Sequence, residues 1–291
     1  MSQLLELYCT IDDFCQQFNR RPTPEILPSD TTKPRRNRTC SLSISELMTL
    51  VILFHQSQYQ HFKGFYLSFV AQSLRKEFPT LPSYSRCIEL LPRCRQSLLA
   101  FLEQVKGEST GIAFVDSTAL PVCHNRRISA HQTFANQAKR GRTSVDWFFG
   151  FKLHLIINHL GELLWGKLTP GNVDDRQPLR EGVPGLQGKL FGDKGYISQP
   201  LKADLAEQRI DLVTKTRRNM KPIPRTDFDN HMLRHRTVIE SVIHRLKSGF
   251  HLQHTRHRSP LNYLIHLLAS LVAYSLSPNK PHLTLNKVLA L

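Results

Sequence analysis

Gly111-Ile112-Ala113-Phe114-Val115-Asp116 is the stretch of sequence that decides the fold, because it is an apolar run that ends in a carboxylate. A short run that is apolar on both faces is typical of a strand buried in the centre of a sheet. An acidic residue at the end of such a strand is held rigidly by the sheet and points into the cleft beyond it. We therefore predict a central strand over 111–116 and a functional carboxylate at Asp116.

Two further acidic residues lie in comparable positions along the chain. Asp193 ends a second short apolar run, Leu190-Phe191-Gly192, and Glu240 lies in the middle of an amphipathic helix predicted over about 231–249. Magnesium prefers oxygen ligands, and two such ions about 3.5–4 Å apart can drive an in-line displacement at phosphorus. Asp116, Asp193 and Glu240 are therefore predicted to be the catalytic residues and the ligands of Mg²⁺, with Mn²⁺ as a substitute ion.

Basic residues surround the third carboxylate. At helical spacing, Arg236 and Lys247 lie on the same stripe of the predicted helix as Glu240. The segment 215–258 holds eleven Lys and Arg against three Asp and Glu. A solvated helix face rarely needs this density of positive charge, whereas a DNA groove does. We assign phosphate contacts to Arg236, Lys247, Lys194, Arg217 and Arg218.

The composition of the whole chain favours a nucleic-acid partner. The 39 Lys and Arg exceed the 23 Asp and Glu, which gives a formal net charge of +16. Such an excess suits DNA better than an acidic protein or a metabolite. No apolar stretch is long enough to span a bilayer, and the N-terminus lacks the pattern of a secretory signal. Six scattered cysteines suit free thiols. We expect a cytoplasmic protein with no membrane partner.

The first part of the chain is predicted to be helical. Ser43-Ile44-Ser45-Glu46 has the form of a capping box and precedes an apolar helix over 47–54. A proline-rich linker covers about 20–40, where the density of proline forbids a helix. Its basic run 33–38 suits either an arm that contacts phosphates or a solvated linker. We interpret residues 1–105 as an all-helical domain.

The second part of the chain, residues 106–291, has the pattern of an α/β domain. The predicted order is strands over 111–116, 147–157 and 162–168, a helix over 175–182, a strand over 189–192, a helix over 199–208, a strand over 211–215, and helices over 231–249 and 260–275. A meander of antiparallel strands that feeds parallel crossovers makes a mixed five-stranded sheet flanked by helices. The basic stretch 123–146 is predicted to be a loop that is mobile or faces DNA.

The residues around the three acids resemble a known family. The pieces Phe114-Val115-Asp116-Ser117-Thr118, Phe191-Gly192-Asp193-Lys194-Gly195-Tyr196 and Arg236-x3-Glu240-x6-Lys247 are similar to the Asp-Asp-Glu (DDE) signature of bacterial insertion-sequence transposases, in the compact single-ORF type. The stretch from Thr169 to Asp175 is similar as well, and the resemblance covers roughly 110–275. In one departure, Leu233 stands where many relatives carry a tyrosine ahead of the helix arginine.

This resemblance implies a fold, an activity and a set of partners. It implies a ribonuclease-H-like catalytic domain over 106–291 with C-terminal helices, and a DNA-end-binding role for the helical domain 1–105. The implied activity is cleavage at the ends of an insertion sequence, followed by joining of the 3′-hydroxyl ends to target DNA by two-metal-ion chemistry. The implied partners are double-stranded DNA, as terminal inverted repeats and as target, and further copies of the chain in a homodimer or larger assembly. The implied location is the nucleoid of a bacterial cytoplasm.

Each carboxylate also has a purely structural interpretation. Asp116 or Asp193 alone suits a turn former, and Glu240 alone suits an ion pair on a solvated helix face. Asp174 and Asp175 are interpreted as the N-cap region of the following helix rather than as metal ligands.

Several other residue types invite a functional interpretation that we set aside. Trp147 and Trp165 suit core packing better than stacking on a flipped base. Cys123 suits a small buried residue better than a nucleophile. No cysteine or carboxylate completes a zinc set with the histidine repeat His251, His254 and His257.

Two other functions fit the same residues. The first is a metal-dependent DNA endonuclease or resolvase without strand transfer. The second is a catalytically inactive DNA-binding derivative.

Overall fold

A computed structural model describes residues 2–20, 41–143, 146–221, 223–253 and 257–284. The proline-rich linker predicted over about 20–40 therefore lies outside the described residues, apart from Arg20. His254 lies outside them as well. The chain divides into two compact units. Unit 1 contains the residues up to Gln104 together with Leu261–Tyr274, and unit 2 contains Val105–Pro260 together with the residues from Ser275 onward.

Unit 1 is all-helical, as predicted for the N-terminal region. Its α-helices are α1 (Ser2–Arg20), α2 (Ile44–Gln56), α3 (Phe62–Gly64), α4 (Ala71–Ser73), α5 (Tyr84–Leu90), α6 (Arg95–Val105) and α11 (Pro260–Leu276). A π-helix, η1 (Phe65–Val70), joins α3 to α4, and a 3₁₀ helix, η2 (Leu91–Cys94), joins α5 to α6. A capping box starts α2, because the amide of Glu46 donates to Ser43 Oγ at 3.0 Å and the amide of Ser43 donates to Glu46 Oε2 at 2.6 Å. This pair satisfies two amides that the first turn of a helix otherwise leaves open.

The last helix completes the core of unit 1. His266 of α11 hydrogen-bonds His55 of α2, with 3.1 Å between Nδ1 and Nε2, and its ring packs edge-on against Phe54 and Phe62. Asn262 donates to the carbonyl of Ile88 at 3.4 Å. The sequence places this helix in the second domain, whereas the compact unit that contains most of it is the first.

Unit 2 is built on a mixed sheet. In the described part of the chain the sheet has six strands, β1 (Ile112–Cys123), β2 (Lys139–Arg142), β3 (Trp147–Asn158), β4 (Leu163–Pro170), β5 (Gly188–Gly192) and β6 (Ile210–Thr214). The order is β2-β3-β1-β5-β6, and β4 also pairs with β3. The antiparallel β1, β3 and β4 are followed by β5 and β6, which run parallel to β1. This is the ribonuclease-H-like arrangement that the sequence predicts.

The sheet has one strand more than the predicted five. The additional strand β2 lies within 123–146, which the sequence predicts to be a loop. Its residues Lys139, Arg140 and Arg142 are exposed and polar, so no apolar alternation marks a strand there. Pairing with β3 forms it, with Lys139 opposite Gly150 and Arg142 opposite Trp147.

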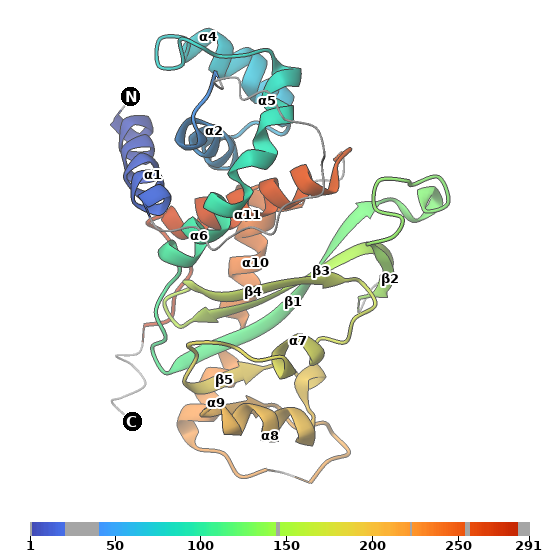
Figure 1. The fold of residues 1–291 in the computed structure, drawn as a ribbon. Helices are drawn as coiled ribbons and strands as arrows, with labels where there is room; N and C mark the ends of the chain where they lie inside the picture. Colours follow the sequence, from blue (N-terminus) through green and yellow to red (C-terminus); the bar gives the residue numbers. More distant parts are fainter. Residues whose placement is uncertain (1, 21–40, 144–145, 222, 254–256, 285–291) are drawn as a thin grey trace. The chain divides into compact units, whose positions relative to one another are not determined.

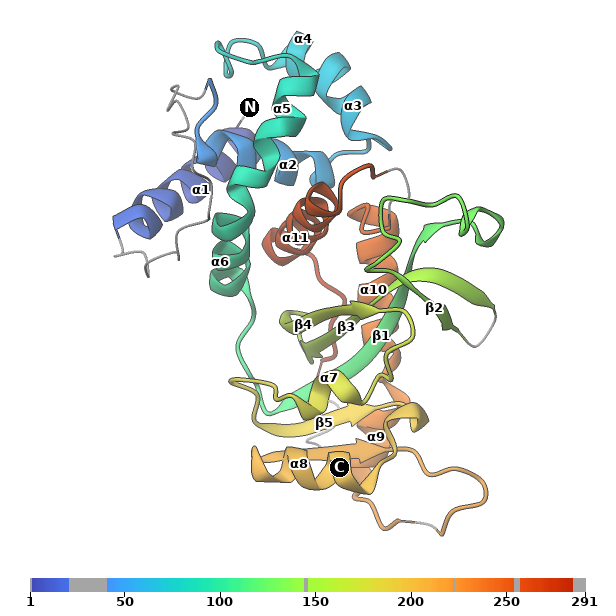
Figure 2. The ribbon, with the colours of Figure 1, turned by 45° about the vertical axis from the view of Figure 1, so that its right-hand side comes forward.

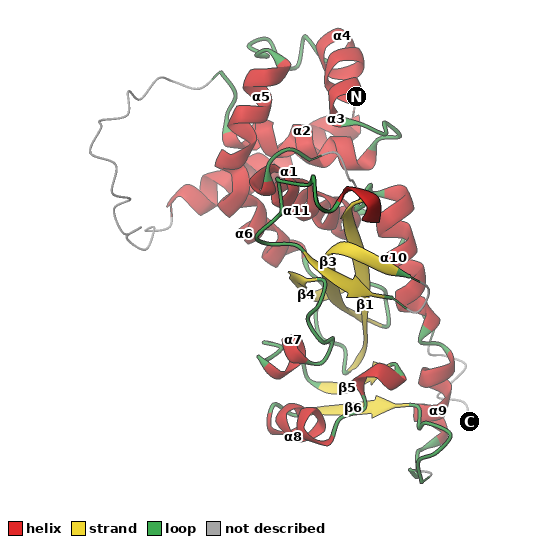
Figure 3. Ribbon diagram, turned by 90° about the vertical axis from the view of Figure 1, so that its right-hand side faces the viewer, coloured by secondary structure: helices red, strands yellow, loops and turns green. Residues whose placement is uncertain are grey.

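Helices cover both faces of the sheet, as Figures 1 and 2 show. On one face α7 (Gln177–Arg180) and α8 (Gln199–Glu207) enclose an apolar core that includes Val115, Leu179 and Leu205. Figure 3 shows β6 beside β5 at the edge where α8 packs. On the other face lie α9 (Asp227–Arg234) and α10 (Thr237–Gly249).

The helix predicted over 231–249 is two helices. α9 ends at Arg234 and α10 begins at Thr237, with Arg236 at its N-cap position. The apolar pattern continues across the junction, since Leu233, Val238 and Ile239 are all buried, so periodicity alone conceals the break. Consequently Glu240 lies in the first turn of α10 and not in the middle of a long helix. The helix dipole favours a negative charge in this first turn.

Candidate active site

Asp116 lies inside β1 and not at its end. The strand continues to Cys123, and Asp116 is directly opposite Leu155 of β3. The prediction of a strand end is therefore wrong for β1. However, the parallel pairing of β1 with β5 stops at Phe114 opposite Phe191. Beyond that pair β1 has lost its β5 neighbour, so the carboxylate still lies at the point where one side of the central strand becomes free.

One arginine joins two of the three predicted carboxylates. Arg236 Nη1 is 3.4 Å from Asp116 Oδ2, and Arg236 Nη2 is 2.7 Å from Glu240 Oε1. The Arg236 side chain is only 16% exposed, against 24% for Asp116 and 53% for Glu240. The docking of α10 on β1 thus brings Asp116 and Glu240 to the same cation, although they are distant in sequence.

The environment of Asp116 is unfavourable for a bare carboxylate. Burial raises the pKa of Asp116, and the charge of Glu240 raises it further. The amide of Ser117, which donates to Asp116 Oδ1 at 2.8 Å, and the guanidinium of Arg236 act in the opposite direction without cancelling the effect of burial. A carboxylate in this position gains stability from any additional cation that approaches it.

Asp193 directly follows β5 and precedes a short 3₁₀ turn, η4 (Lys194–Tyr196). Its carbonyl accepts a hydrogen bond from the amide of Tyr196 at 3.0 Å, while its carboxylate makes no capping bond and is exposed. Gly192 lets this turn pack closely, because a Cβ there would lie 3.2 Å from both Tyr196 Cδ2 and Val115 Cγ1.

The three carboxylates do not form one cluster. Among the residues that the structure describes, no three His, Cys, Asp or Glu side chains are grouped so as to hold a metal ion. The structure therefore brings Asp116 and Glu240 together through Arg236, and it does not gather Asp193 with them.

The basic residues assigned to phosphates differ in accessibility. Lys247 is partly buried, and its Nζ donates to the carbonyl of Ala119 in β1 at 3.1 Å. Burial lowers the pKa of Lys247. In contrast, Lys194, Arg217 and Arg218 are exposed. Lys247 thus fixes α10 to the strand that carries Asp116, whereas the other three face solvent.

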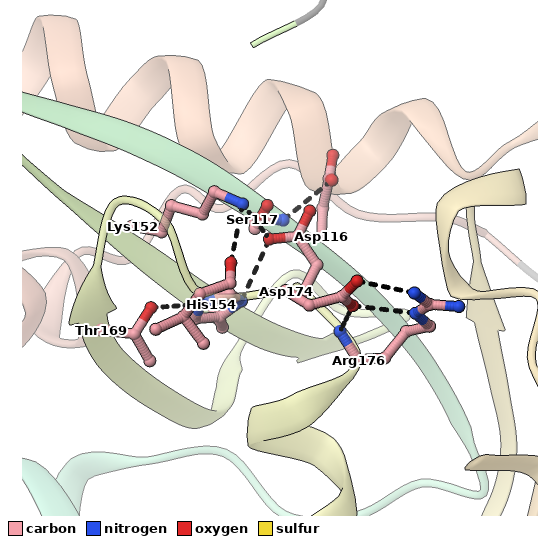
Figure 4. A network of polar contacts seen from close by, with 9 residues as sticks. Asp116, Ser117, Lys152, His154, Thr169, Asp174 and Arg176 are labelled. Carbon is pink, nitrogen blue, oxygen red and sulfur yellow. Dashed lines mark hydrogen bonds and ion pairs between the residues drawn. The ribbon is translucent and has the colours of Figure 1, made fainter. Parts of the chain in front are cut away.

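A partly buried polar network on β3 and the segment after β4 was not predicted from the sequence (Figure 4). Lys152 Nζ donates to Asp175 Oδ1 at 2.9 Å and to the carbonyl of Val173 at 3.0 Å. His154 Nε2 lies 2.9 Å from Thr169 Oγ1, and its Nδ1 lies 3.8 Å from Asp175 Oδ1. Burial lowers the pKa of His154 to about 4, so the imidazole is neutral at physiological pH.

The N-capping interpretation is wrong for Asp175 and holds only in part for Asp174, whose Oδ1 accepts a hydrogen bond from the amide of Arg176 at 2.9 Å just before α7. The helix α7 begins at Gln177, and its N-cap position is Arg176. Asp174 also accepts two hydrogen bonds from the Arg176 side chain, at 2.8 and 2.6 Å, which lower the pKa of Asp174 to about 2. Asp175 contacts Lys152. The available signal was Lys152 and His154, two polar residues on one face of a strand whose only other polar residue is its last, Asn158.

Tyr196 connects the turn after Asp193 to this region. Its side chain is 3% exposed, and burial followed by the charges of Asp116 and Asp175 raises the pKa of its phenol well above the ordinary value. The Tyr196 side chain itself packs in the apolar core that contains Val115 and Leu205.

Of the remaining interpretations of the tryptophans and cysteines, some agree with the structure and one is wrong. Trp165 packs against the sheet core, as predicted, but Trp147 is 55% exposed, so its assignment to the core is wrong. Cys123 is half-buried with a raised pKa caused by burial, which is unsuited to a nucleophile. The cysteines in the described residues, Cys9, Cys15, Cys87, Cys94 and Cys123, are free thiols.

Comparison with known proteins identifies a shared domain. The sequence model of a family described as "Transposase DDE domain" matches residues 106–260. No curated protein sequence matches the chain. The part of the chain that the structure describes contains no helix with the length and apolar character needed to cross a membrane.

Solved structures with similarity to the chain include transposase–DNA complexes. A piggyBac transposase synaptic complex with hairpin DNA has a TM-score of 0.46 and 12% identity, and the match covers 83% of this chain and 69% of that chain. A Mos1 mariner paired-end complex with Mn has a TM-score of 0.24 and 13% identity, over 91% of this chain and 86% of that chain.

Proposed function

The chain belongs to the DDE transposase family, and on this basis we propose that it cleaves the ends of an insertion sequence and joins the 3′-hydroxyl ends to target DNA. The observation that carries the proposal is the convergence of Asp116 and Glu240 on Arg236. These two acids come from a central strand and from a helix on the face of the sheet, so the fold itself brings them together.

The residues fit a divalent cation by their chemistry. Asp116 and Glu240 offer carboxylate oxygens, the donors that Mg²⁺ and Mn²⁺ prefer, and they already share one positive group. The raised pKa of Asp116 reflects a carboxylate with too little compensating charge. We assign Asp116, Glu240 and Asp193 as the ligands. When bound, the metal supplies polarisation of the scissile phosphate and activation of the attacking water or hydroxyl.

The protein residues position the DNA around this site. Arg236 holds Asp116 and Glu240 in place, and its guanidinium is suited to a phosphate once a metal ion satisfies the carboxylates. Lys247 fixes α10 against β1. The exposed Lys194, Arg217 and Arg218 are assigned to contacts with the DNA backbone, which supplies most of the salt-dependent affinity.

The partners that we propose follow from the family. The helical unit binds the terminal inverted repeats, the sheet unit binds the scissile phosphates and the target duplex, and two or more copies of the chain join the two ends. We place the protein at the nucleoid of a bacterial cytoplasm.

A catalytically inactive DNA-binding derivative is the second candidate, because Asp193 is not gathered with the other two acids in the described residues. The two candidates differ in the role of Asp193. An active enzyme needs its carboxylate for metal binding, whereas a binding protein does not.

The test uses a duplex with a 3′-hydroxyl donor end and a supercoiled plasmid target. With Mg²⁺ we expect joined products from the wild-type protein and background levels from Asp116→Asn, Asp193→Asn and Glu240→Gln, with DNA binding retained in all four. Cleavage without joining would indicate an endonuclease or resolvase. Wild-type binding to DNA with no metal-dependent cleavage would establish the inactive derivative.

A further inference from the structure

The end of the sheet where β1, β2 and β3 meet carries a surface that the proposed active site does not use. We call it the Trp147 surface and define it by Trp147, Arg126, Arg127, Arg140 and Arg142. Trp147 is 55% exposed, and the four arginines are exposed as well. An exposed indole ring offers a flat apolar face on which a ligand can stack.

Strand register gathers part of this surface on one face of the sheet. In the antiparallel β2–β3 pair, Arg142 is opposite Trp147 and Arg140 is opposite Phe149, so their side chains share a face. Arg142 Cζ lies 5.8 Å from the centroid of the Trp147 ring, a cation–π contact. The ring is thus held on a strand with a cation beside it.

A second segment contributes the other two arginines. Asn125 Nδ2 donates to the carbonyl of Trp147 at 2.7 Å. Asn125 begins the short turn η3 (Asn125–Arg127), so this bond fixes Arg126 and Arg127 next to the strand that carries the indole. Arginines on two segments that are separated in sequence are therefore carried next to Trp147.

The charge around the ring is strongly positive. The chain has no acidic residue between Asp116 and Asp146. Asp146, directly before Trp147, contributes one carboxylate, whose Oδ1 accepts a hydrogen bond from the amide of Trp147 at 2.7 Å, and the four arginines outnumber it. Within the residues that the structure describes, none of the four arginines forms an ion pair.

We propose that the Trp147 surface binds an unpaired segment of DNA, with a base stacked on the Trp147 indole and the neighbouring phosphates held by the four arginines. An aromatic ring set among cations suits single-stranded nucleic acid, because every unpaired base exposes a flat face and every nucleotide carries a phosphate. A duplex hides its base faces in the helical stack, so it can use the cations but not the ring. This inference rests on the proposed function only for the choice of DNA as the nucleic acid.

The test uses Trp147 as its own reporter. The chain has two tryptophans, so Trp165→Phe leaves Trp147 as the sole indole. Full-length protein with this change is titrated in EDTA with a thymidine oligonucleotide of about 15 nucleotides, and separately with a duplex of equal length. We expect saturable, salt-sensitive quenching of Trp147 fluorescence by the single strand and much weaker quenching by the duplex.

Substitutions then separate stacking from charge. Trp147→Ala should weaken single-strand binding about tenfold in fluorescence anisotropy, and Trp147→Phe should recover part of that loss. Leu160→Ala, which removes another exposed apolar side chain, 42% exposed, from the turn at the other end of β3, should leave the affinity unchanged. Because Trp147 is exposed, its variants should keep the wild-type melting temperature.

Wild-type single-strand affinity in Trp147→Ala, or absence of quenching in Trp165→Phe, would overturn the proposal. The result is independent of catalysis because the titrations contain no metal ion. Normal cleavage without quenching would remove this inference and keep the proposed function. Quenching without cleavage would keep the inference and remove the proposed function.

Discussion

Arg236 is the residue on which the candidate site depends. Its guanidinium occupies the position between Asp116 and Glu240 where a shared cation is needed, within hydrogen-bonding distance of both. The same arginine therefore stabilises the two carboxylates without metal and competes with any metal ion that binds them. This double role makes the effects of substitutions at these three positions distinguishable.

Asp116→Asn should raise the melting temperature of the metal-free protein by a few degrees at neutral pH. Burial raises the pKa of Asp116, so the folded chain binds this proton more tightly than the unfolded chain and the ionised form reduces stability. The advantage of the variant should shrink as the pH falls and the wild-type carboxyl becomes protonated. Differential scanning calorimetry across pH measures it; a lower melting temperature for the variant at every pH would refute the argument.

A bound metal ion should instead raise the melting temperature of the wild type relative to that of Asp116→Asn. At a hundredfold excess over its dissociation constant, a ligand specific for the native state stabilises by about 2.7 kcal/mol. Mg²⁺ or Mn²⁺ should therefore raise the melting temperature of the wild type and leave Asp116→Asn almost unchanged. Asp211→Asn, which removes an exposed aspartate elsewhere on the sheet, is the matched control and should respond like the wild type.

Arg236→Gln should tighten Mn²⁺ binding at pH 8 and reduce cleavage. The tighter binding follows from removing the cation that competes for the carboxylates, and the reduced cleavage follows from losing the group assigned to hold the phosphate. Isothermal titration and an end-cleavage assay measure the two effects, with Arg236→Lys as the variant that should recover part of the activity. Weaker Mn²⁺ binding in Arg236→Gln at this pH would show that Arg236 organises the site more than it competes for it.

At this scale the sequence singles out candidate acids but does not predict what they contact. Asp116 and Glu240 stand out because of their apolar and basic surroundings. The contact of Asp175 with Lys152 does not, because it depends on how the segment after β4 returns over β3. Likewise, the exposure of Trp147 depends on where the sheet ends and not on the alternation of the strand.

At the scale of elements, the break between α9 and α10 shapes the site. It places Glu240 in a first helical turn and Arg236 at the preceding cap. The position of α9 is in turn fixed from β5, because Lys189 Nζ lies 2.5 Å from Asp229 Oδ1. Asp229 also closes a capping box with Thr226 at the start of α9. One carboxylate therefore both begins the helix and attaches it to the sheet.

Asp229→Ala should destabilise unit 2 by about 1–2 kcal/mol, since it removes a helix cap and a partly buried ion pair. Although burial opposes it, hydrogen bonds from Lys189 and Thr226 lower the pKa of Asp229 below its ordinary value. Its contribution is therefore full above the pKa of an unfolded aspartate and is lost as the pH falls through the lower folded value. Urea unfolding at neutral and acidic pH measures it; Asp227→Ala, an exposed neighbour in the same turn, is the control.

The elements show why periodicity has limits. The apolar pattern predicts five of the six described strands, most clearly β3, which is buried on both faces. It does not predict β2, whose side chains are polar, or the end of α9, where buried residues continue on both sides of the junction. Pairing partners and chain reversal determine these two features, and neither is written into a local run of residues.

At the scale of the whole molecule, unit 1 is discontinuous in sequence. It consists of the N-terminal helices and Leu261–Tyr274 of the last helix, with the entire sheet between them. Adjacency in sequence favours grouping α11 with α10, so the sequence assigns it to the wrong compact unit. In the structure residues on every side of α11 are buried, including Ile265, Ala269 and Tyr274.

A fragment that ends after Gln104 should lack cooperative unfolding, because it loses the aromatic and histidine contacts of α11. Joining residues 260–276 to that fragment by a flexible linker should restore a cooperative transition in circular dichroism. His266→Ala in the joined protein should reduce its stability by about 2–4 kcal/mol, as expected for a large buried side chain. A cooperative transition in the fragment without α11 would contradict the assignment of that helix.

The return of α11 to the first unit also has a consequence for synthesis. A ribosome releases the N-terminal helices long before it has made Leu261–Tyr274, so the nascent helices stay incomplete while the intervening sheet emerges and folds. We expect chaperones to bind and protect these early helices during translation. We also expect products that stop before α11 to be degraded. Only chains translated through Tyr274 could then complete the first unit.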